Sequence, residues 1–191
     1  MKGYIYITGT GADPGLHNNL DDPLFGDPPT LGACMTNIRQ FVEPGDYIFV
    51  VSGSVPTAAP YIIGGLRVAE KIDHLAAYGR FQQNRLRRDE NGFVRGNIIV
   101  DPQGKQHPLD HHKPETFEDR IKNFIVGDEA AALQTRREVE LGRERTLRKL
   151  SDLFERPGNR AIDIMGRMRK LDEPQVHGLM DWLRGIKSEA K

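Results

Sequence analysis

The densest group of side chains able to carry acid–base or metal chemistry is the segment His-Pro-Leu-Asp-His-His, residues 107–112. Histidine titrates near neutral pH and a carboxylate can orient it, so His107, Asp110 and His111 are candidates for a general acid or base. If the segment is extended, His107 and His111 lie about 13 Å apart at roughly 3.3 Å per residue, too far to share one metal ion. Cys34, the only cysteine, is the candidate nucleophile. The competing interpretations are a histidine that contacts a base or phosphate and a purely structural use of these residues.

A glycine pair, Gly9 and Gly11, follows the first expected strand and invites a dinucleotide-binding interpretation. That fingerprint needs a helix directly after the glycines, and the prolines and glycines of residues 14–29 disfavour one. The loop 13–27 could also bind a divalent cation through its carboxylates and Asn18. Its spacing does not match a calcium loop, and aspartate and asparagine are common turn residues. The sequence therefore predicts no cofactor and no metal site.

Basic residues gather in residues 80–95, although the chain as a whole is neutral. Lysine and arginine number 27, as do aspartate and glutamate, which argues against a constitutive nucleic-acid binder. The segment nevertheless carries five arginines against Asp89 and Glu90, and a neutral protein can present one basic face. The candidate phosphate-binding residues are Arg80, Arg85, Arg87 and Arg88. A solvated loop is the alternative interpretation.

The elements that must position these residues change in character along the chain. Apolar runs and alternation predict strands near residues 3–8, 46–51, 61–68 and 122–126, a hairpin within 96–109, and helices over 31–42 and 69–78. After Gly127-Asp128, helical periodicity predicts helices over 129–155, 160–170 and 174–187. The sequence thus predicts an α+β domain over residues 1–127. A helical extension over 128–191 packs on this domain or mediates association.

The overall composition of the chain indicates its cellular location. With 191 residues and 38% hydrophobic residues, it can bury a core without disulfides or structural metal ions. No stretch approaches the roughly 20 apolar residues of a membrane span, and the first residues lack the apolar core of a signal peptide. A single cysteine also fits a reducing compartment. We therefore expect a cytoplasmic protein that does not bind membranes.

Short motifs between Cys34 and Glu70 carry a resemblance to a known family. They are Cys34 in a helix, Ile38-Arg39, the turn Gly45-Asp46, the strand end Ser52-Gly53-Ser54, and Arg67-Val68-Ala69-Glu70. Residues 3–68 resemble the PUA-like superfamily of small barrels, which includes EVE, ASCH and YTH domains. The order of the motifs is most similar to the second type of nucleotide modification associated domain. The resemblance covers about the first 125 residues and implies a PUA-like small β-barrel with flanking helices, followed here by the helical C-terminal tail.

The resemblance also implies a pocket for a base or modified nucleotide, in proteins linked to DNA modification or its sensing. The candidate base-binding residues are Thr8, Thr10, Arg39, Ser52, Gly53, Ser54, Tyr61 and Phe81. We therefore expect a nucleic-acid-binding module, with DNA favoured over RNA, and assign no catalytic residues. One alternative is an enzyme that acts on a nucleotide or base through His107, Asp110 and His111 or through Cys34. Another is an interaction module whose C-terminal helices form a homodimer.

Overall fold

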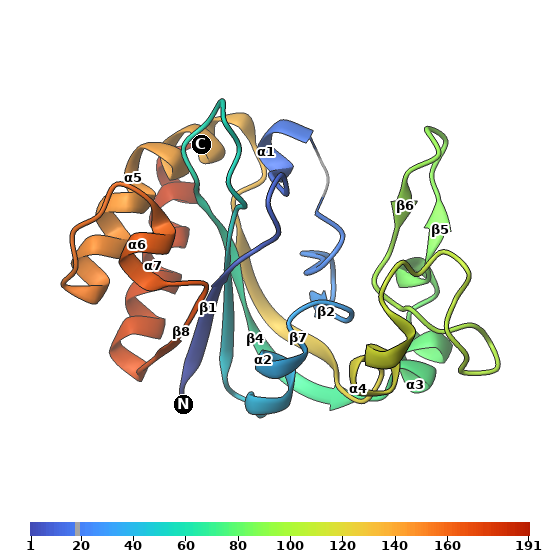
Figure 1. Cartoon of the computed structure of the whole chain (residues 1–191). Helices are drawn as coiled ribbons and strands as arrows, with labels where there is room; N and C mark the ends of the chain where they lie inside the picture. Colours follow the sequence, from blue (N-terminus) through green and yellow to red (C-terminus); the bar gives the residue numbers. More distant parts are fainter. Residues whose placement is uncertain (18–19) are drawn as a thin grey trace. The chain divides into compact units, whose positions relative to one another are not determined.

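The structure of the protein, a computed structural model, describes residues 1–17 and 20–191 (Figure 1). It is mixed α+β, with a six-stranded sheet in the order β2-β7-β4-β3-β1-β8. These strands are β1 (Gly3–Ile7), β2 (Thr30–Leu31), β3 (Tyr47–Val51), β4 (Ile62–Ile72), β7 (Phe124–Ala132) and β8 (Met168–Leu171). Strand β1 runs parallel to β3, whereas the pairs β1–β8, β3–β4 and β2–β7 are antiparallel. Strands β2 and β8 are the two edges, so the sheet formed by the described residues is not closed into a barrel.

The remaining elements are helices and one small ribbon. The helices are α1 (Pro14–His17), α2 (Thr36–Phe41), α3 (His74–Arg80), α4 (Phe117–Arg120), α5 (Arg136–Phe154), α6 (Ala161–Met165) and α7 (Glu173–Glu189), with 3-10 turns at Gln82–Asn84 and Pro114–Thr116. A separate two-stranded antiparallel ribbon consists of β5 (Arg87–Arg88) and β6 (Val94–Arg95). Within the part of the chain that the structure describes, none of the helices combines the length and the hydropathy needed to cross a membrane.

The chain forms two compact units. Unit 1 contains residues 1–20, 46–67 and 130–191, and unit 2 contains residues 21–45 and 68–129. Strands β4 and β7 pass from one unit into the other, because each has residues in both. The C-terminal helices and the first strand therefore belong to the same unit. The division into domains 1–127 and 128–191 stays a prediction.

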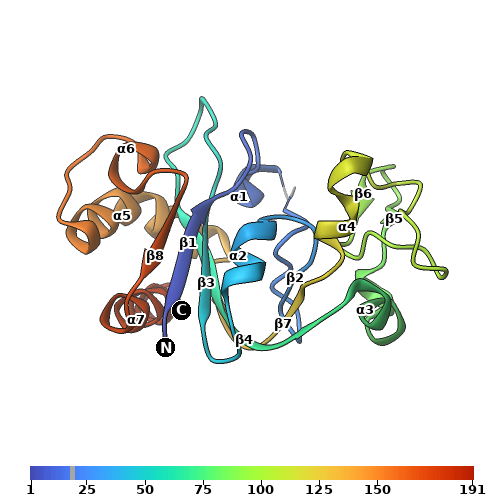
Figure 2. The same cartoon turned by 60° about the horizontal axis from the view of Figure 1, so that its bottom comes forward.

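Unit 1 is built on the parallel pair β1 and β3. All five residues of β3 are buried, which explains why this strand is a continuous apolar run rather than an alternating one. Helices α5 and α7 each begin with a capping box, formed by Thr135 with Glu138 and by Asp172 with Gln175. Figure 2 shows α5, α6 and α7 grouped beside β1 and β8. Helix α7 buries the stripe Val176, Leu179, Met180, Leu183 and Ile186.

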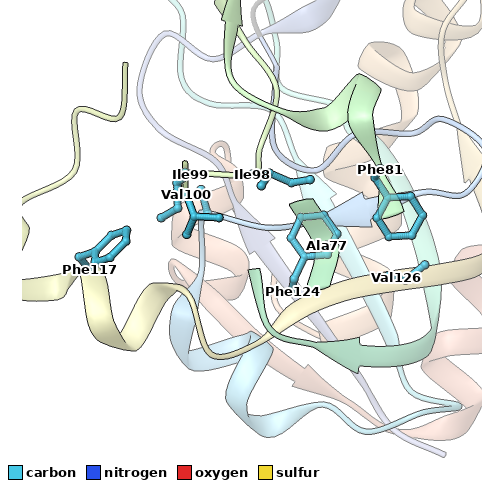
Figure 3. Packing of buried hydrophobic residues seen from close by; sticks show 9 residues of the cluster. Ala77, Phe81, Ile98, Ile99, Val100, Phe117, Phe124 and Val126 are labelled. Carbon is cyan, nitrogen blue, oxygen red and sulfur yellow. The ribbon is translucent and has the colours of Figure 1, made fainter. Parts of the chain in front are cut away.

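Unit 2 has its own apolar cluster (Figure 3). Its buried members are Ala33, Ala77, Phe81, Ile98, Ile99, Val100, Phe117, Phe124 and Val126. The ring of Phe124 stacks on Phe81 at 6.1 Å between centroids and meets the edge of His74 at 5.2 Å. These contacts join α3 to β7. Phe81, a candidate for base stacking, is therefore part of a packed core and is 6% exposed.

Two helix starts predicted from the sequence are wrong because a strand continues through them. Strand β4 runs on to Ile72, so the helix expected over 69–78 begins only at His74, where the Asp73 side chain accepts a hydrogen bond from the backbone of Ala76. Strand β7 likewise extends to Ala132, and the helix expected from residue 129 begins at Arg136. In both cases sheet pairing overrides local helix propensity until a capping residue is reached.

Other predicted elements are shorter or of another kind. The helix expected over 31–42 covers only Thr36–Phe41, since residues 30–31 form β2. The helix expected over 160–170 ends at Met165, before Gly166 with φ +71°, and Met168–Leu171 then pairs with β1 as β8. The hairpin expected within 96–109 reduces to one bridge, between Val100 and Gln106.

Candidate functional site

A cavity of about 220 Å³ lies in unit 1, where β1 and β3 end, and we call it the strand-end cavity. Its lining residues are Ile7, Thr8, Thr10, Ser52, Ser54, Ala58, Pro60, Asn159, Arg160, Ala161, Ile162 and Arg167. Because β1 and β3 are parallel neighbours, the residues that follow each strand meet at one edge of the sheet. Ligands in open sheets commonly bind outside the carboxyl ends of parallel strands. The position of the cavity therefore suits a binding site.

The two strand ends are held against each other by backbone contacts at Gly53. Its N–H donates to the carbonyl of Ala12 at 2.8 Å, and Gly11 donates to the carbonyl of Ser54 at 3.1 Å. A Cβ atom at Gly53 would overlap the carbonyl oxygen of Gly9, so only glycine permits this approach. Gly53, which the sequence predicts to bind a base, thus has a structural role. It lets the Thr8–Thr10 segment lie beside the Ser52–Ser54 segment.

Four predicted base-binding residues line the strand-end cavity together, namely Thr8, Thr10, Ser52 and Ser54. Ser52 is fully buried, and its hydroxyl accepts a hydrogen bond from the backbone N–H of Tyr61 at 3.0 Å. Ser54 is exposed. A hydroxyl can donate and accept at once, so a set of them can match either a donor or an acceptor on a ligand. The hydroxyl-bearing part of the lining is therefore suited to a polar edge of a ligand.

The other lining residues include a group from the C-terminal segment, 159–167, where no local sequence pattern indicates a site. Arg160 forms two hydrogen bonds with Asp163, of 2.8 and 2.7 Å, and this pairing lowers the pKa of the Asp163 carboxyl. The exposed Arg167 guanidinium makes no hydrogen bond or ion pair with the residues that the structure describes. The carbonyl of Arg167 accepts from the N–H of Ile7 at 3.0 Å, which anchors this segment to β1. Arg167, which lines the cavity, thus carries a charge that none of the described residues neutralises.

Tyr61 does not line the strand-end cavity. Its ring is buried under the Arg143 guanidinium, whose central carbon lies 4.8 Å from the ring centroid. Arg143 also holds the buried Asp13 carboxylate through two hydrogen bonds of 3.0 and 2.7 Å. Burial, with Asp13 close by, raises the pKa of Tyr61 to about 12. Asp13, from the acidic loop, is therefore an ion-pair partner in the core of unit 1, and Asn18 of that loop lies outside the described residues.

Arg39 belongs to unit 2 and is 0% exposed. Its guanidinium donates to the carbonyl oxygens of Cys34 at 2.8 Å, Arg120 at 2.9 Å and Ala33 at 3.2 Å, and also to that of Asn123. These bonds join the loop before α2 to the end of α4. Arg39 is thus a donor for buried backbone groups, and like Phe81 it is not among the residues that line the strand-end cavity.

Each of the four candidate phosphate-binding arginines in unit 2 already has a protein contact. Arg80 pairs with Glu70 at 2.6 Å, and Arg85 donates twice to the carbonyl of Tyr78 while lying 3.8 Å from its ring centroid. In the β5–β6 ribbon, Arg87 donates to the carbonyl of Gln83 and Arg88 to that of Gly92. Arg80, Arg87 and Arg88 are exposed, and Arg85 is partly buried. The exposed guanidinium groups keep further donors for a ligand.

The Asp110 carboxylate, an acid–base candidate, pairs with a histidine that is not among the candidates. Asp110 Oδ1 lies 2.6 Å from Nδ1 of His112, and Gln106 donates to its other oxygen at 2.8 Å. Burial alone would raise the pKa of Asp110, but the hydrogen bonds from His112 and Gln106 outweigh it and lower the pKa. His107 Nδ1 accepts from the backbone of Leu109 at 3.1 Å. The Asp110 carboxylate therefore pairs with His112, whereas the Asp110 backbone N–H donates to the carbonyl of His107 at 2.8 Å.

Cys34 lies beside the buried Asp22 carboxylate in unit 2. Asp22 accepts hydrogen bonds from the backbone N–H groups of Gly32 at 2.7 Å and Ala33 at 2.9 Å, and from that of Cys34. Burial, together with the Asp22 charge, raises the pKa of the Cys34 thiol to about 12. A thiol with this pKa is protonated at neutral pH and is a poor nucleophile. Among the described residues, no group of three or more histidine, cysteine or acidic side chains could hold a metal ion.

The chain matches no protein-family model, and no curated protein sequence matches it significantly.

Proposed function

We propose that the protein is a nucleic-acid-binding module that receives a single base or modified nucleotide in the strand-end cavity. One observation carries this proposal. Hydroxyl-bearing residues from the ends of two parallel strands line the same cavity as Arg167, a cation with no ion-pair partner among residues 1–17 and 20–191. Hydroxyls suit the hydrogen-bonding edge of a base, and a guanidinium suits a phosphate.

The dimensions and the apolar part of the lining support a small planar ligand. A cavity of about 220 Å³ is smaller than the roughly 300–1,000 Å³ of sites for drug-sized ligands. Pro60 and the 43% exposed Ile162 supply apolar faces against which a ring can lie. None of the lining residues that the structure describes is aromatic, so the base is held here by aliphatic contacts and hydrogen bonds. Extruding a base from a duplex costs a few kcal/mol, which these contacts must offset.

The PUA-like fold and the link to DNA modification or its sensing are part of the same proposal. They rest on the resemblance of the motifs from Cys34 to Glu70, of which Ser52-Gly53-Ser54 lies at the strand-end cavity. DNA is the proposed nucleic acid. A homodimer through the C-terminal helices stays a prediction.

The first test concerns Arg167. We expect Arg167→Ala to weaken the binding of nucleoside monophosphates about tenfold or more, because the variant cannot form the charge-assisted hydrogen bond to the phosphate. Binding of the corresponding nucleosides, which lack the phosphate, should change little. Isothermal titration calorimetry with a panel of common and modified bases measures both effects. Arg136→Ala, which removes an arginine with a 94% exposed side chain from α5, is the matched control.

Two results would contradict the cavity assignment. One is a panel in which no nucleotide or nucleoside binds the wild-type protein. The other is an Arg167→Ala variant that binds monophosphates as tightly as the wild type does. Replacing Thr8 with valine keeps the shape of the side chain but removes the hydroxyl. This variant should therefore weaken the binding of nucleosides and of monophosphates to a similar degree.

The second test concerns the basic segment of unit 2. We expect the double variant Arg87→Ala/Arg88→Ala to weaken DNA binding to a similar degree for all sequences. Its salt slope, the dependence of log affinity on log salt concentration, should fall by about one for each arginine that no longer binds a phosphate. Fluorescence anisotropy of labelled oligonucleotides at several salt concentrations measures both quantities. Arg136→Ala/Arg137→Ala removes two adjacent exposed arginines elsewhere and should leave the slope unchanged. Equal slopes in all three proteins would remove this segment from the proposed binding surface.

A further inference from the structure

The β5–β6 hairpin, residues 87–95, has features that the proposed pocket does not use. Figure 1 shows it as a narrow two-stranded ribbon whose turn points away from the rest of unit 2. Arg87 pairs across the ribbon with Arg95, and Arg88 with Val94. Cross-strand partners lie on one face of a sheet, and successive residues alternate between faces. Both faces of the ribbon therefore carry arginine.

The turn of this hairpin is held by a dense set of hydrogen bonds to Asp89. Its carboxylate accepts from the backbone of Asn91 and from that of Phe93, each at 2.9 Å, and from Nε of Arg95 at 2.9 Å. The backbone N–H of Asp89 donates to the carbonyl of Phe93 at 2.9 Å. Gly92 adopts φ +81°, which closes the turn without side-chain strain. These hydrogen bonds favour a single conformation of the tip.

This ordered tip presents Phe93 to solvent. Phe93 is 63% exposed, the highest value among the exposed large hydrophobic side chains of the described residues. The guanidinium carbon of Arg95 lies 5.8 Å from its ring centroid, and Arg87 and Arg88 are exposed nearby on the strands. An aromatic ring on a rigid turn, with cations on both faces of the ribbon behind it, is placed to contact a ligand that has both stacking surfaces and negative charge.

Nucleic acid has both properties. The hairpin and its approach carry four arginines against Asp89 and Glu90, and Asp89 is already neutralised by Arg95. A two-stranded ribbon fits into a DNA groove, and apolar side chains are known to insert between base steps as wedges. An acidic protein surface would satisfy the arginines but offers no stack of rings to Phe93. Duplex DNA therefore accounts for both sets of side chains.

We propose that the β5–β6 hairpin enters a groove of duplex DNA and inserts Phe93 between neighbouring base pairs, while Arg87 and Arg88 contact the flanking phosphates. This inference rests on the nucleic-acid-binding part of the proposed function and adds a second contact surface to it. Partial unstacking of a duplex lowers the cost of extruding a base, which a single-base pocket requires. The hairpin thus assists the base extrusion that binding of a single base in the strand-end cavity requires.

The test uses a DNA duplex of two helical turns with 2-aminopurine in the middle, since the fluorescence of this base analogue rises when it is unstacked. Saturating wild-type protein should raise the fluorescence. Phe93→Ala should abolish the rise and weaken binding about tenfold, because alanine has no ring to stack against the bases. Phe93→Leu, which keeps an apolar wedge, should retain a reduced rise. Phe41→Ala, which removes a 50% exposed phenylalanine from α2 of the same unit, is the matched control and should behave as the wild type does.

The proposal is overturned if the duplex does not bind, or if it binds with no rise in fluorescence. It is equally overturned if Phe93→Ala gives the wild-type rise. Phe93 is exposed, so the variant should keep the wild-type melting temperature, and circular dichroism checks this directly. Failure of the cavity assignment would be seen in a different experiment, the titration with monophosphates, as binding that does not depend on Arg167. Phe93→Ala should leave that monophosphate binding unchanged, which keeps the two proposals distinguishable.

Discussion

Replacing Arg39 with alanine is expected to lower the free energy of unfolding by about 3–5 kcal/mol, because the change leaves several buried carbonyl groups without a donor. Arg39 is 0% exposed, and its guanidinium donates to backbone carbonyls both before α2 and at the end of α4. Alanine also leaves a cavity in a close-packed region. Urea denaturation followed by circular dichroism measures the loss.

Controls can separate this buried role from a general effect of charge removal. Lys105→Ala removes an exposed cation from unit 2 and should change the free energy of unfolding by less than about 0.5 kcal/mol. If Arg39→Ala does not fold, Arg39→Lys provides the measurement. A lysine ammonium has three donors at one point and cannot reproduce the planar fork, so a smaller loss is expected. A loss below about 1 kcal/mol in both variants would contradict the structural role of Arg39, because leaving even one buried carbonyl unsatisfied costs about that much.

Acidification from pH 7 towards pH 4 is expected to remove about 3 kcal/mol of stability through His74 alone. The ring is 0% exposed, with Nε2 at 3.0 Å from the carbonyl oxygen of Gly32 and Nδ1 accepting from the N–H of Ile99 at 3.3 Å. Burial, assisted by the charge of Arg39, lowers the pKa of His74 from 6.5 to about 4. Between these values the unfolded chain binds a proton that the folded protein does not. Stability from His74 is therefore complete above about pH 6.5 and is lost progressively as the pH falls from 6.5 to about 4.

The comparison with a glutamine variant isolates this residue from the carboxylates that also titrate. Glutamine can donate and accept near the same positions but does not gain a proton, so His74→Gln should show a flatter pH dependence of the unfolding free energy. His111→Gln changes an exposed histidine of the same unit and should retain the wild-type dependence. Urea titrations at pH 7, 5.5 and 4.5 provide the data. If the unfolding free energy depends on pH identically in the wild type and in His74→Gln, His74 is not the group responsible for the loss of stability in acid.

Several parts of the fold follow from local sequence. The continuous apolar run at residues 46–51 predicts a buried strand, and β3 occupies Tyr47–Val51 with every residue buried. The helical stripe expected over 174–187 is found in α7, where Val176, Leu179 and Leu183 are buried. These elements could be predicted because periodicity and a capping or turn residue define them without help from distant residues.

The candidate site could be predicted only in part. The ends of two strands were recognisable as polar segments, and the structure places Thr8, Thr10, Ser52 and Ser54 on one cavity. Asn159, Arg160 and Arg167 were missed, since no local pattern indicates which side of the sheet a distant loop will cover. The turn residues Pro157-Gly158 before Asn159 were the one available signal, because they mark a loop after a long helix.

The sequence by itself therefore determined the mixed α+β class, the positions of β1 and β3, and the polar character of their ends, because these depend on side-chain period and turn chemistry within a few residues. Tertiary structure decided that Met168–Leu171 is a strand, since pairing with the edge of β1 satisfies its backbone. It also decided that Arg39 serves buried carbonyls and that Arg167 reaches the strand-end cavity. Such choices depend on which backbone groups and surfaces remain unsatisfied after the local elements have packed, and this is known only when distant parts of the chain have come together.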